Sequence, residues 1–506
     1  MKKKLILLIL LLLTISVGVT YAIFKWTSTN SDVTFNVEGC YITYDAGSNI
    51  SGASFGPALS KDDTTNVISK KITMTPECSG VTATLTLKVD SIDTELKDTS
   101  FIYQLYTGST LVSSGNFSDA TVGKVYNLLN TKTLTKDVTD TYTLYIYIDG
   151  NMDNPTTMGG KSFSFTLGAS GQNALYKKPS VNAVTLVEGL DKGTTGDSGS
   201  GVYKVQHDAT PSSNSATGSE IPAVTDYRYY GPSPNNYICL DMEGGSTCPD
   251  KHLYRIIGSI YEEKENTNRI KVIKATPLTD GTTSRFSWDY TSSGSYSNIW
   301  ATITSGNYSN SLTSGSTLMK LLNSGAWWNG TSGSYYNNGT TATNVNFTNY
   351  KLSDKAKSYV TVSRYYLSGY TTGDVNTTTM YGYERGTNRY DTNRPLYWDG
   401  NVGLMYPSDF GYAAGNTCVT GTTLYNYDGG CMNKDWLYIS NTVQWLMSPN
   451  SGSSYYVFGV DSTGYVDYSD HTSSSYVFSA RPVFYLTSSA SISDGEGTSA
   501  APYILS

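Results

Sequence analysis

Residues 445–486 contain, in order, WLMSP (445–449), YYVFGV (455–460), DSTG (461–464), YVDY (465–468) and ARPVFYL (480–486). Apolar and polar residues alternate on both sides of the DSTG segment, which predicts two antiparallel strands joined by a tight turn. Arg481 and Pro482 precede a further predicted strand, Val483–Leu486. Proline suits the first position of a strand, because that position needs no hydrogen-bond donor for the ladder. The stretch therefore predicts a β-rich C-terminal region.

These motifs resemble the end of an uncharacterised domain family, the DUF6273 type, which is common in surface proteins of gut Gram-positive bacteria. The resemblance covers residues 227–506. It implies a fold related to C-type-lectin-like domains and formylglycine-generating enzymes, that is, an α+β domain with long loops and few helices. It implies no activity, because the family has no agreed function. The segments that match its opening strands, its one helix and a later strand are Tyr237–Leu240, Leu253–Gly258, Ile270–Ala275, Ser316–Asn323 and Val402–Ser408.

The N-terminus has the features of an export signal. Lys2–Lys4 precede an apolar run that extends to Val19, and the segment Thr20–Ala22 follows. A positive start, an apolar centre and small residues near the end predict a secretory signal peptide. The apolar stretch continues through Phe24 and is also long enough for a membrane anchor. Cleavage after Ala22 and retention of residues 1–24 as an anchor both place the rest of the chain outside the cell or at its surface.

Residues 25–170 are predicted to form an all-β sandwich, because short alternating or β-branched segments follow one another between turn residues. Gly18–Phe24 and Val33–Val37 also resemble the start of camelysin-type and biofilm matrix-fibre proteins, which are exported β-sandwich proteins, some of which polymerise. The predicted strands are Val33–Val37, Ile72–Thr75, Val81–Val89, Phe101–Tyr106, Tyr142–Ile148 and Ser162–Leu167.

Residues 171–226 are rich in Gly, Ser, Thr and Pro, a composition typical of flexible linkers. Within them, Val202–Val205 alone has the character of a short strand that docks on a neighbour. The sequence thus predicts four parts: a leader or anchor (1–24), a β-sandwich (25–170), a linker (171–226) and a C-type-lectin-like domain (227–506).

The cysteines agree with export, because disulfides persist in oxidising compartments. Six cysteines allow fifteen pairings, and their spacing favours one pair in each region. No Cys-x-x-Cys motif occurs and the three histidines are scattered, so neither a metal nor a cofactor is expected. The predicted disulfides are Cys40–Cys78, Cys239–Cys248 and Cys418–Cys431.

Composition excludes one class of partner and suggests another. The net charge is −7 and only 15% of residues are charged, so the phosphate neutralisation on which nucleic-acid binding depends is not available. The chain contains 43 tyrosines. Tyrosine and tryptophan beside small polar residues are typical of recognition surfaces, since they offer a large contact area at low entropic cost.

Seven residues in Tyr- and Gly-rich context are the ligand-binding candidates. For the tryptophans the alternative is core packing, which we favour for Trp327 and Trp445, and for the aspartates the alternative is a solvated turn. The candidates are Trp288, Trp300, Trp398, Asp399, Tyr455, Tyr465 and Asp467.

Three functions remain open at this stage. The first is a cell-surface binding or adhesion protein that contacts glycans or proteins and is not an enzyme, with no catalytic residue predicted. The alternative is a structural matrix or fibre subunit that assembles with copies of itself by strand addition. A third is an extracellular hydrolase that uses paired acids such as Asp391 and Asp399, whose separation would decide the mechanism. Membrane contact is expected only through an uncleaved N-terminal segment.

Overall fold

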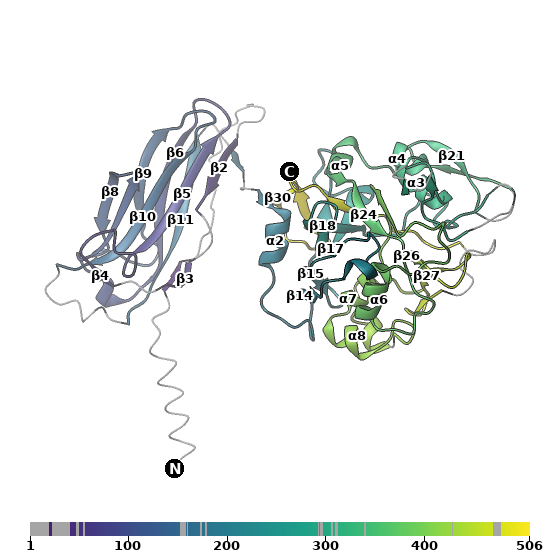
Figure 1. Ribbon diagram of the computed structural model, residues 1–506. Helices are drawn as coiled ribbons and strands as arrows, with labels where there is room; N and C mark the ends of the chain where they lie inside the picture. The colour runs from purple at the N-terminus through teal and green to yellow at the C-terminus, as the bar shows by residue number, and fades with distance from the viewer. Residues whose placement is uncertain are drawn as a thin grey trace, which may run out of the picture. The chain divides into compact units, whose positions relative to one another are not determined.

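The computed structural model describes residues 20–22, 41–46, 50–53, 56–151, 158, 160–172, 175–177, 180–291, 293, 297–304, 307–308, 312–337, 341–427, 429–468 and 477–506. The chain divides into two compact units, Met1–Pro179 and Ser180–Ser506. Among the described residues, strands account for 37% and helices for 14%, and both units are built mainly from sheets (Figure 1). The predicted β-rich class with several sheets and few helices is confirmed.

The first unit is a β-sandwich of two sheets. One has the strand order β3-β1-β11-β6-β9, and the other has the order β12-β2-β5-β10-β7-β8 with β4 paired to β10. Phe101 from one sheet and Phe163 from the other pack edge to face, with 5.1 Å between ring centroids. The strands are β1 Thr20–Ala22, β2 Tyr41–Asp45, β3 Ile50–Ala53, β4 Pro57–Ala58, β5 Ile68–Pro76, β6 Thr82–Ile92, β7 Phe101–Thr107, β8 Thr110–Asn116, β9 Val125–Thr133, β10 Asp140–Asp149, β11 Phe163–Gln172 and β12 Leu175–Lys177.

Alternation along the strands explains this sandwich. In β6, Ala83, Leu85, Leu87 and Val89 are buried, while the residues between them are half-buried or exposed. One face therefore enters the core and the other meets solvent. Five predicted strands are confirmed, as parts of β5, β6, β7, β10 and β11. The predicted starts of β6, β7 and β11 agree to within one residue, whereas β5 and β10 begin four and two residues earlier than predicted. Val33–Val37 lies outside the described residues.

Most of the predicted leader also lies outside the described residues. Only Thr20–Ala22 is described, as strand β1 between β3 and β11. Among the residues that the structure describes, no helix is both long and apolar enough to cross a membrane. Whether residues 1–24 are cleaved or retained stays a prediction.

The second unit is built on a ten-stranded sheet. Its main path is β13-β30-β31-β16-β17-β18-β29-β23, and the hairpin β14–β15 joins it through β17. The strands are β13 Val181–Asn182, β14 Gly201–His207, β15 Val224–Tyr230, β16 Tyr237–Cys239, β17 Leu253–Glu262, β18 Thr267–Lys274, β19 Ile303–Thr304, β20 Asn307–Tyr308, β21 Ser332–Tyr335, β22 Thr343–Asn346, β23 Val360–Thr361, β24 Ser363–Tyr366, β25 Tyr397–Gly400, β26 Gln444–Pro449, β27 Val457–Val460, β28 Val466–Asp467, β29 Val483–Leu486, β30 Ser491–Asp494 and β31 Tyr503–Leu505. The α-helices are α2 Ala183–Gly189, α3 Thr317–Asn323, α4 Ala326–Asn329, α5 Asp354–Ser358, α6 Thr377–Glu384, α7 Pro407–Ala413, α8 Asn416–Gly421 and α9 Gly429–Met432.

The C-terminal motifs form the elements that their pattern predicts. β27 and β28 pair antiparallel across the turn at residues 461–464, and Val483–Leu486 is strand β29, which lies between β18 and β23 in the large sheet. Helix α3 begins where predicted, because the Ser316 hydroxyl accepts a hydrogen bond from the backbone N–H of Met319.

One predicted strand is wrong. Within Val402–Ser408 only Gly403 forms a β-bridge, to Val483, and helix α7 begins at Pro407. Proline is favoured in the first turn of a helix, and the Asp409 carboxylate accepts from the Tyr406 N–H at 3.0 Å. These two local signals end the extended segment earlier than the apolar pattern suggests.

The linker prediction is also wrong for residues 180–226, which belong to the second unit. They contain helix α2 and strand β14, and β14 pairs with β15 along its whole length. Val202, Tyr203 and Val205 are buried. The apolar residues within Val202–Val205 favour a strand even though the surrounding residues are Gly, Ser and Thr. The predicted docking of this short strand on a neighbour therefore describes the region better than its linker-like composition does.

Two of the three predicted disulfides are confirmed, Cys239–Cys248 and Cys418–Cys431. Cys40 lies outside the described residues, so its pairing with Cys78 stays a prediction. Disulfides fit an oxidising extracellular environment.

Candidate recognition surface

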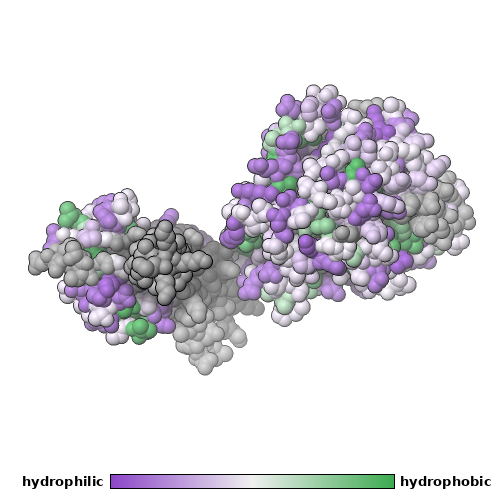
Figure 2. All heavy atoms as spheres, turned by 90° about the horizontal axis from the view of Figure 1, so that it is seen from below, coloured by the Kyte–Doolittle hydropathy of each residue, from purple (hydrophilic) through white to green (hydrophobic). Residues whose placement is uncertain are grey.

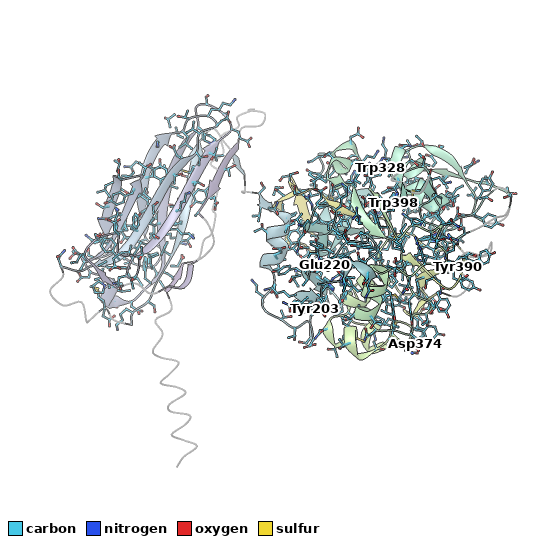
Figure 3. All side chains as sticks on the ribbon, viewed as in Figure 1. Tyr203, Glu220, Trp328, Asp374, Tyr390 and Trp398 are labelled. Atoms are coloured by element: carbon cyan, nitrogen blue, oxygen red, sulfur yellow. A yellow bond between two sulfur atoms is a disulfide. The ribbon has the colours of Figure 1, made fainter. Side chains whose placement is uncertain are left out.

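The three tryptophans predicted to bind ligand are core residues. Trp288, Trp300 and Trp398 are 1%, 2% and 0% exposed, and Figure 3 shows Trp398 inside the second unit. Trp300 packs against both others, with ring centroids 5.0 Å and 6.2 Å apart. The prediction that they form an exposed surface is corrected: large indoles contribute most when buried. Trp327 and Trp445 are buried as well, as favoured from the sequence.

Asp399 is not an open carboxylate either. It is 6% exposed and accepts two hydrogen bonds from Arg364, from Nε at 2.9 Å and from Nη2 at 3.1 Å. Such a bidentate pair engages both carboxylate oxygens. Asp399 on β25 therefore forms a cross-strand ion pair with Arg364 on β24. Of the two acids named for a hydrolase, Asp391 and Asp399, the second is thus already engaged by an arginine.

Exposed aromatic side chains are few in the second unit. Among its described residues they are Tyr390, Tyr425, Tyr455 and Tyr465. We call these four side chains, together with the loop 369–375, the tyrosine face. The visible surface of this unit is mostly hydrophilic or neutral in Figure 2, with only small hydrophobic spots. Of the six large hydrophobic side chains that are exposed among its described residues, four are tyrosines and two are valines, Val181 and Val362.

The loop 369–375 connects the segments that carry these four tyrosines. Three of the segments form backbone hydrogen bonds with the loop, and the fourth bonds to a segment that does. Segments far apart in the sequence therefore lie next to one another. The backbone bonds are Gly369 N to Asn388 O (3.3 Å), Ser451 N to Tyr370 O (3.1 Å), Tyr425 N to Gly373 O (2.9 Å) and Val466 N to Leu424 O (2.9 Å).

Two features fix the loop. The rings of Tyr370 and Tyr383 stack with 3.8 Å between centroids and 3° between planes. Gly373 lies so close to the carbonyl oxygen of Val466 that a Cβ there would be 2.5 Å away, so only glycine allows this approach. Asp467, the remaining candidate, is half-buried in β28 and accepts from the Tyr468 N–H at 2.6 Å.

A small cavity of about 20 Å³ opens beside Tyr390. Two arginines line it, Arg389 and Arg394, together with Trp300 and two prolines. We call it the arginine slot. Its volume accommodates a group the size of a water molecule or a little larger, not a whole sugar ring.

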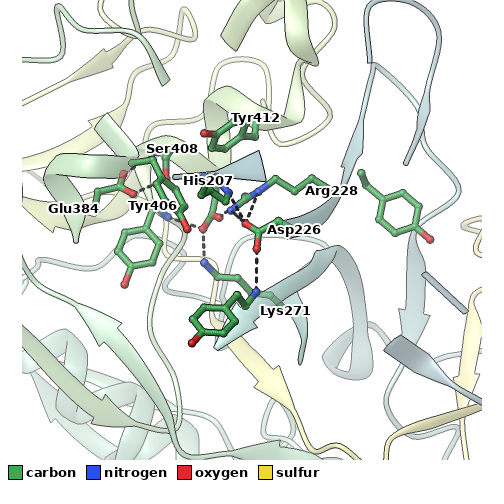
Figure 4. Close-up of polar contacts among 12 residues, drawn as sticks. His207, Asp226, Arg228, Lys271, Glu384, Tyr406, Ser408 and Tyr412 are labelled. Atoms are coloured by element: carbon green, nitrogen blue, oxygen red, sulfur yellow. Dashed lines mark hydrogen bonds and ion pairs between the residues drawn. The ribbon is translucent and has the colours of Figure 1, made fainter. Parts of the chain in front are cut away.

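The second unit also contains a buried network of charged side chains (Figure 4). Arg228 Nη2 lies 2.7 Å from Asp226 Oδ2, and Arg228 Nη1 lies 3.0 Å from Asp409 Oδ1. Lys271 Nζ is 2.5 Å from Asp409 Oδ2, and His207 Nε2 is 3.0 Å from Asp226 Oδ2. These contacts connect β14, β15, β18 and α7.

Neighbouring charges set the titration of this network. Burial alone would raise the pKa values of Asp226 and Asp409, but the adjacent cations Arg228 and Lys271 hold both below their usual range. Burial lowers the pKa of His207 in spite of its hydrogen bond to Asp226. The ring is therefore neutral near pH 7, and its Nε2–H donates to the carboxylate.

Glu384 is a second buried acid nearby. It accepts from the Ser408 N–H at 2.9 Å and from the Ser408 hydroxyl at 2.5 Å, and burial raises its pKa to about 7. Acids and bases with shifted pKa values often mark catalytic sites. None of these groups, however, lines the arginine slot or the larger cavity of about 470 Å³ beside α3. The network therefore joins secondary-structure elements inside the unit.

One cluster has the donor types of a metal site. Ligand atoms of Asp241, Glu243 and His252 lie within 4.8 Å of one another, next to the Cys239–Cys248 disulfide. The ammonium of Lys251 is 2.7 Å from Glu243 Oε1, and His252 Nε2 is 3.1 Å from the same oxygen. The protein thus already provides a cation for Glu243, and Asp241 accepts a hydrogen bond from the Ser353 hydroxyl.

Sequence analysis did not identify Tyr390, Tyr425, Arg389 or Arg394. A signal was available, because Arg389 and Arg394 lie in a charge-poor region around a tyrosine and beside Pro395. No protein-family model matches the chain, and no curated protein matches it.

Proposed function

We propose that the protein is exported and acts at the cell surface, where the tyrosine face binds glycan or protein ligands. One observation carries this proposal: all exposed aromatic side chains among the described residues of the second unit lie on segments joined through one loop. Scattered surface aromatics need no explanation, but aromatic side chains on adjoining segments can contribute to one interaction site. No catalytic role is proposed for it.

Binding of the purified protein to arrays of glycans and surface proteins tests this function. We expect Tyr390→Ala and Tyr455→Ala each to weaken binding about tenfold or more, as truncation of an aromatic anchor does. Val362→Ala is the control, because Val362 is also exposed but carries no aromatic ring. Equal binding by all three variants, or no ligand on broad arrays, would reject the proposal.

We further propose that the second unit has the C-type-lectin-like fold that its motifs resemble. The large sheet, the helix α3 at the predicted position and the long insertion between β18 and β26 support this idea. Comparison of an experimental structure with C-type-lectin-like domains tests it, and a different strand order would rule it out.

A fibre subunit is the second candidate, favoured by the edges of the first unit. β8 and β9 end the described paths of their sheets, and Leu111 on β8 and Val125 on β9 are exposed. Edge strands with exposed apolar residues can pair with another chain. Electron microscopy of the concentrated protein tests this candidate, which fails if only monomers are found.

A further inference from the structure

The arginine slot has an excess of positive charge. Arg394 is largely buried and donates from Nη1 to the Ser297 hydroxyl at 3.1 Å. Its nearest carboxylate, Asp391, is 3.7 Å from Nε, which is too far for a hydrogen bond. Arg389 donates from Nη1 to the Arg394 carbonyl at 2.9 Å, and no ion pair to Arg389 is found among the described residues. Two arginines thus line the slot, and the one carboxylate within ion-pair distance, Asp391, is partly exposed and pairs with Arg394 alone among the described residues.

The environment makes this charge costly. Burial lowers the pKa of Arg394, and the charges of Asp391 and Asp289 oppose that shift only in part. Asp289 acts from beyond ion-pair distance, and burial raises its own pKa to about 6. A desolvated guanidinium with incomplete compensation favours an additional anion, because guanidinium and carboxylate groups match as planar bidentate partners.

The surroundings of the slot indicate what carries the anion. Tyr390 at the rim is 48% exposed and offers a ring face, while Asn388 and Ser451 line the slot with neutral polar groups. A sugar ring presents C–H groups that can pack on the ring of Tyr390. Its hydroxyls can form hydrogen bonds with the Asn388 amide and the Ser451 hydroxyl. The slot itself admits only a small substituent, so the ring would remain outside on Tyr390.

We propose that the arginine slot binds the carboxylate of an acidic sugar whose ring rests on Tyr390. This inference depends on the proposed function, since it names the ligand class of the same surface. Arg389 and Arg394 would donate to the carboxylate, and the remaining tyrosines would contact adjoining sugar units.

The test compares a glucuronic-acid-containing oligosaccharide with its carboxyl-reduced form by calorimetry on the purified protein. Loss of charge-assisted hydrogen bonds worth about 1.5–3 kcal/mol corresponds to roughly 10–100-fold weaker binding of the reduced form. Arg389→Met should lower the affinity for the acidic form several-fold, toward that of the reduced form, and should change the affinity for the reduced form much less. Arg394→Lys keeps the charge but loses the planar fork, and should give a smaller loss.

The outcomes separate the slot from the tyrosine face. Equal affinity for the two oligosaccharides, with Tyr390→Ala weakening both, would overturn the slot proposal and leave the proposed function intact. Binding of an Asp/Glu-rich peptide but of neither oligosaccharide would overturn the sugar assignment in favour of a protein partner. If neither oligosaccharide nor peptide binds and broad arrays show no ligand, both proposals fail.

Discussion

The two units of this protein bury different kinds of core. Among the described residues of the first unit, Lys70 is the only buried polar or charged side chain, whereas the second unit buries Asp226, Arg228, Lys271 and Asp409 within one network. The first core is held by apolar area removed from water. The second also depends on charges that are stable only while each keeps its partner. The two units should therefore differ in their sensitivity to mutation and to pH.

The largest effect is expected for Arg228→Met. This change leaves Asp226 and Asp409 buried without their shared cation, and breaking a buried pair costs about 3–5 kcal/mol. Calorimetry should show the transition of the second unit shifted strongly downward and that of the first unit unchanged.

Lys204→Met is the matched control for Arg228→Met. Lys204 lies 3.6 Å from Asp191 and is about half exposed, and exposed pairs contribute roughly 0–1 kcal/mol. Equal shifts for the two variants would mean that the buried network does not stabilise the second unit.

Leu87→Ala is the corresponding change in the apolar core. Leu87 is fully buried in β6, and Leu→Ala substitutions at such positions cost about 2–5 kcal/mol, including the cavity that remains. Only the first unit's unfolding transition should fall. Val125→Ala, at an exposed position in β9, serves as control and should change stability by less than about 0.5 kcal/mol. A drop in both transitions after Leu87→Ala would show that the units unfold together.

The two cores also differ in how well the sequence predicts them. The strands of the sandwich follow from local alternation, as in Ala83–Val89, so β5, β6, β7, β10 and β11 could be placed directly. The partners of Arg228 could not, because Asp226 is local but Asp409 joins it only through the fold of the whole second unit. Local pattern contains no information on such distant pairing.

The candidate site was predicted in part. The abundance of tyrosine indicates a recognition surface, and Tyr455 and Tyr465 are exposed on it. The tryptophans were wrongly predicted to be exposed, because composition does not show which aromatic side chains are buried. Burial of an indole removes a large apolar area from water, which favours the core. Tyr390 and Tyr425 join the surface only through the loop 369–375, whose hydrogen bonds no sequence pattern displays.

Acidification from pH 7 to about 4.5 should affect the stability of the two units differently. Burial raises the pKa of Glu384 to about 7, so the folded second unit takes up this proton before the unfolded chain does at about 4.5. Its stability therefore rises as pH falls from about 7 to 4.5, by up to roughly 3 kcal/mol from this group. Hydrogen bonds lower the pKa values of Asp98 and Asp119 in the first unit, so that unit loses stability below about pH 4.

Two histidines oppose the trend of the second unit. Burial lowers the pKa values of His207 and His252, so their contribution is lost as pH falls below about 6.5. Denaturant titrations of Glu384→Gln and the unchanged protein across pH 8 to 4.5 isolate the glutamate. As the pH falls from 8 to 4.5, the free energy of unfolding of the unchanged protein should rise relative to that of Glu384→Gln. A difference that is constant with pH would contradict the raised pKa.

The smallest stability effect is expected on the tyrosine face. Tyr455→Phe removes a hydroxyl from an exposed side chain and should change the free energy of unfolding by less than about 0.5 kcal/mol. Tyr406→Phe removes a buried hydroxyl that accepts from the Tyr366 N–H at 2.6 Å, and leaving that N–H unsatisfied costs about 1–3 kcal/mol. Chemical denaturation of the two variants compares the two uses of tyrosine in one unit. If Tyr455→Phe destabilised the unit as much as Tyr406→Phe, Tyr455 would be part of the scaffold rather than of a surface kept free for a ligand.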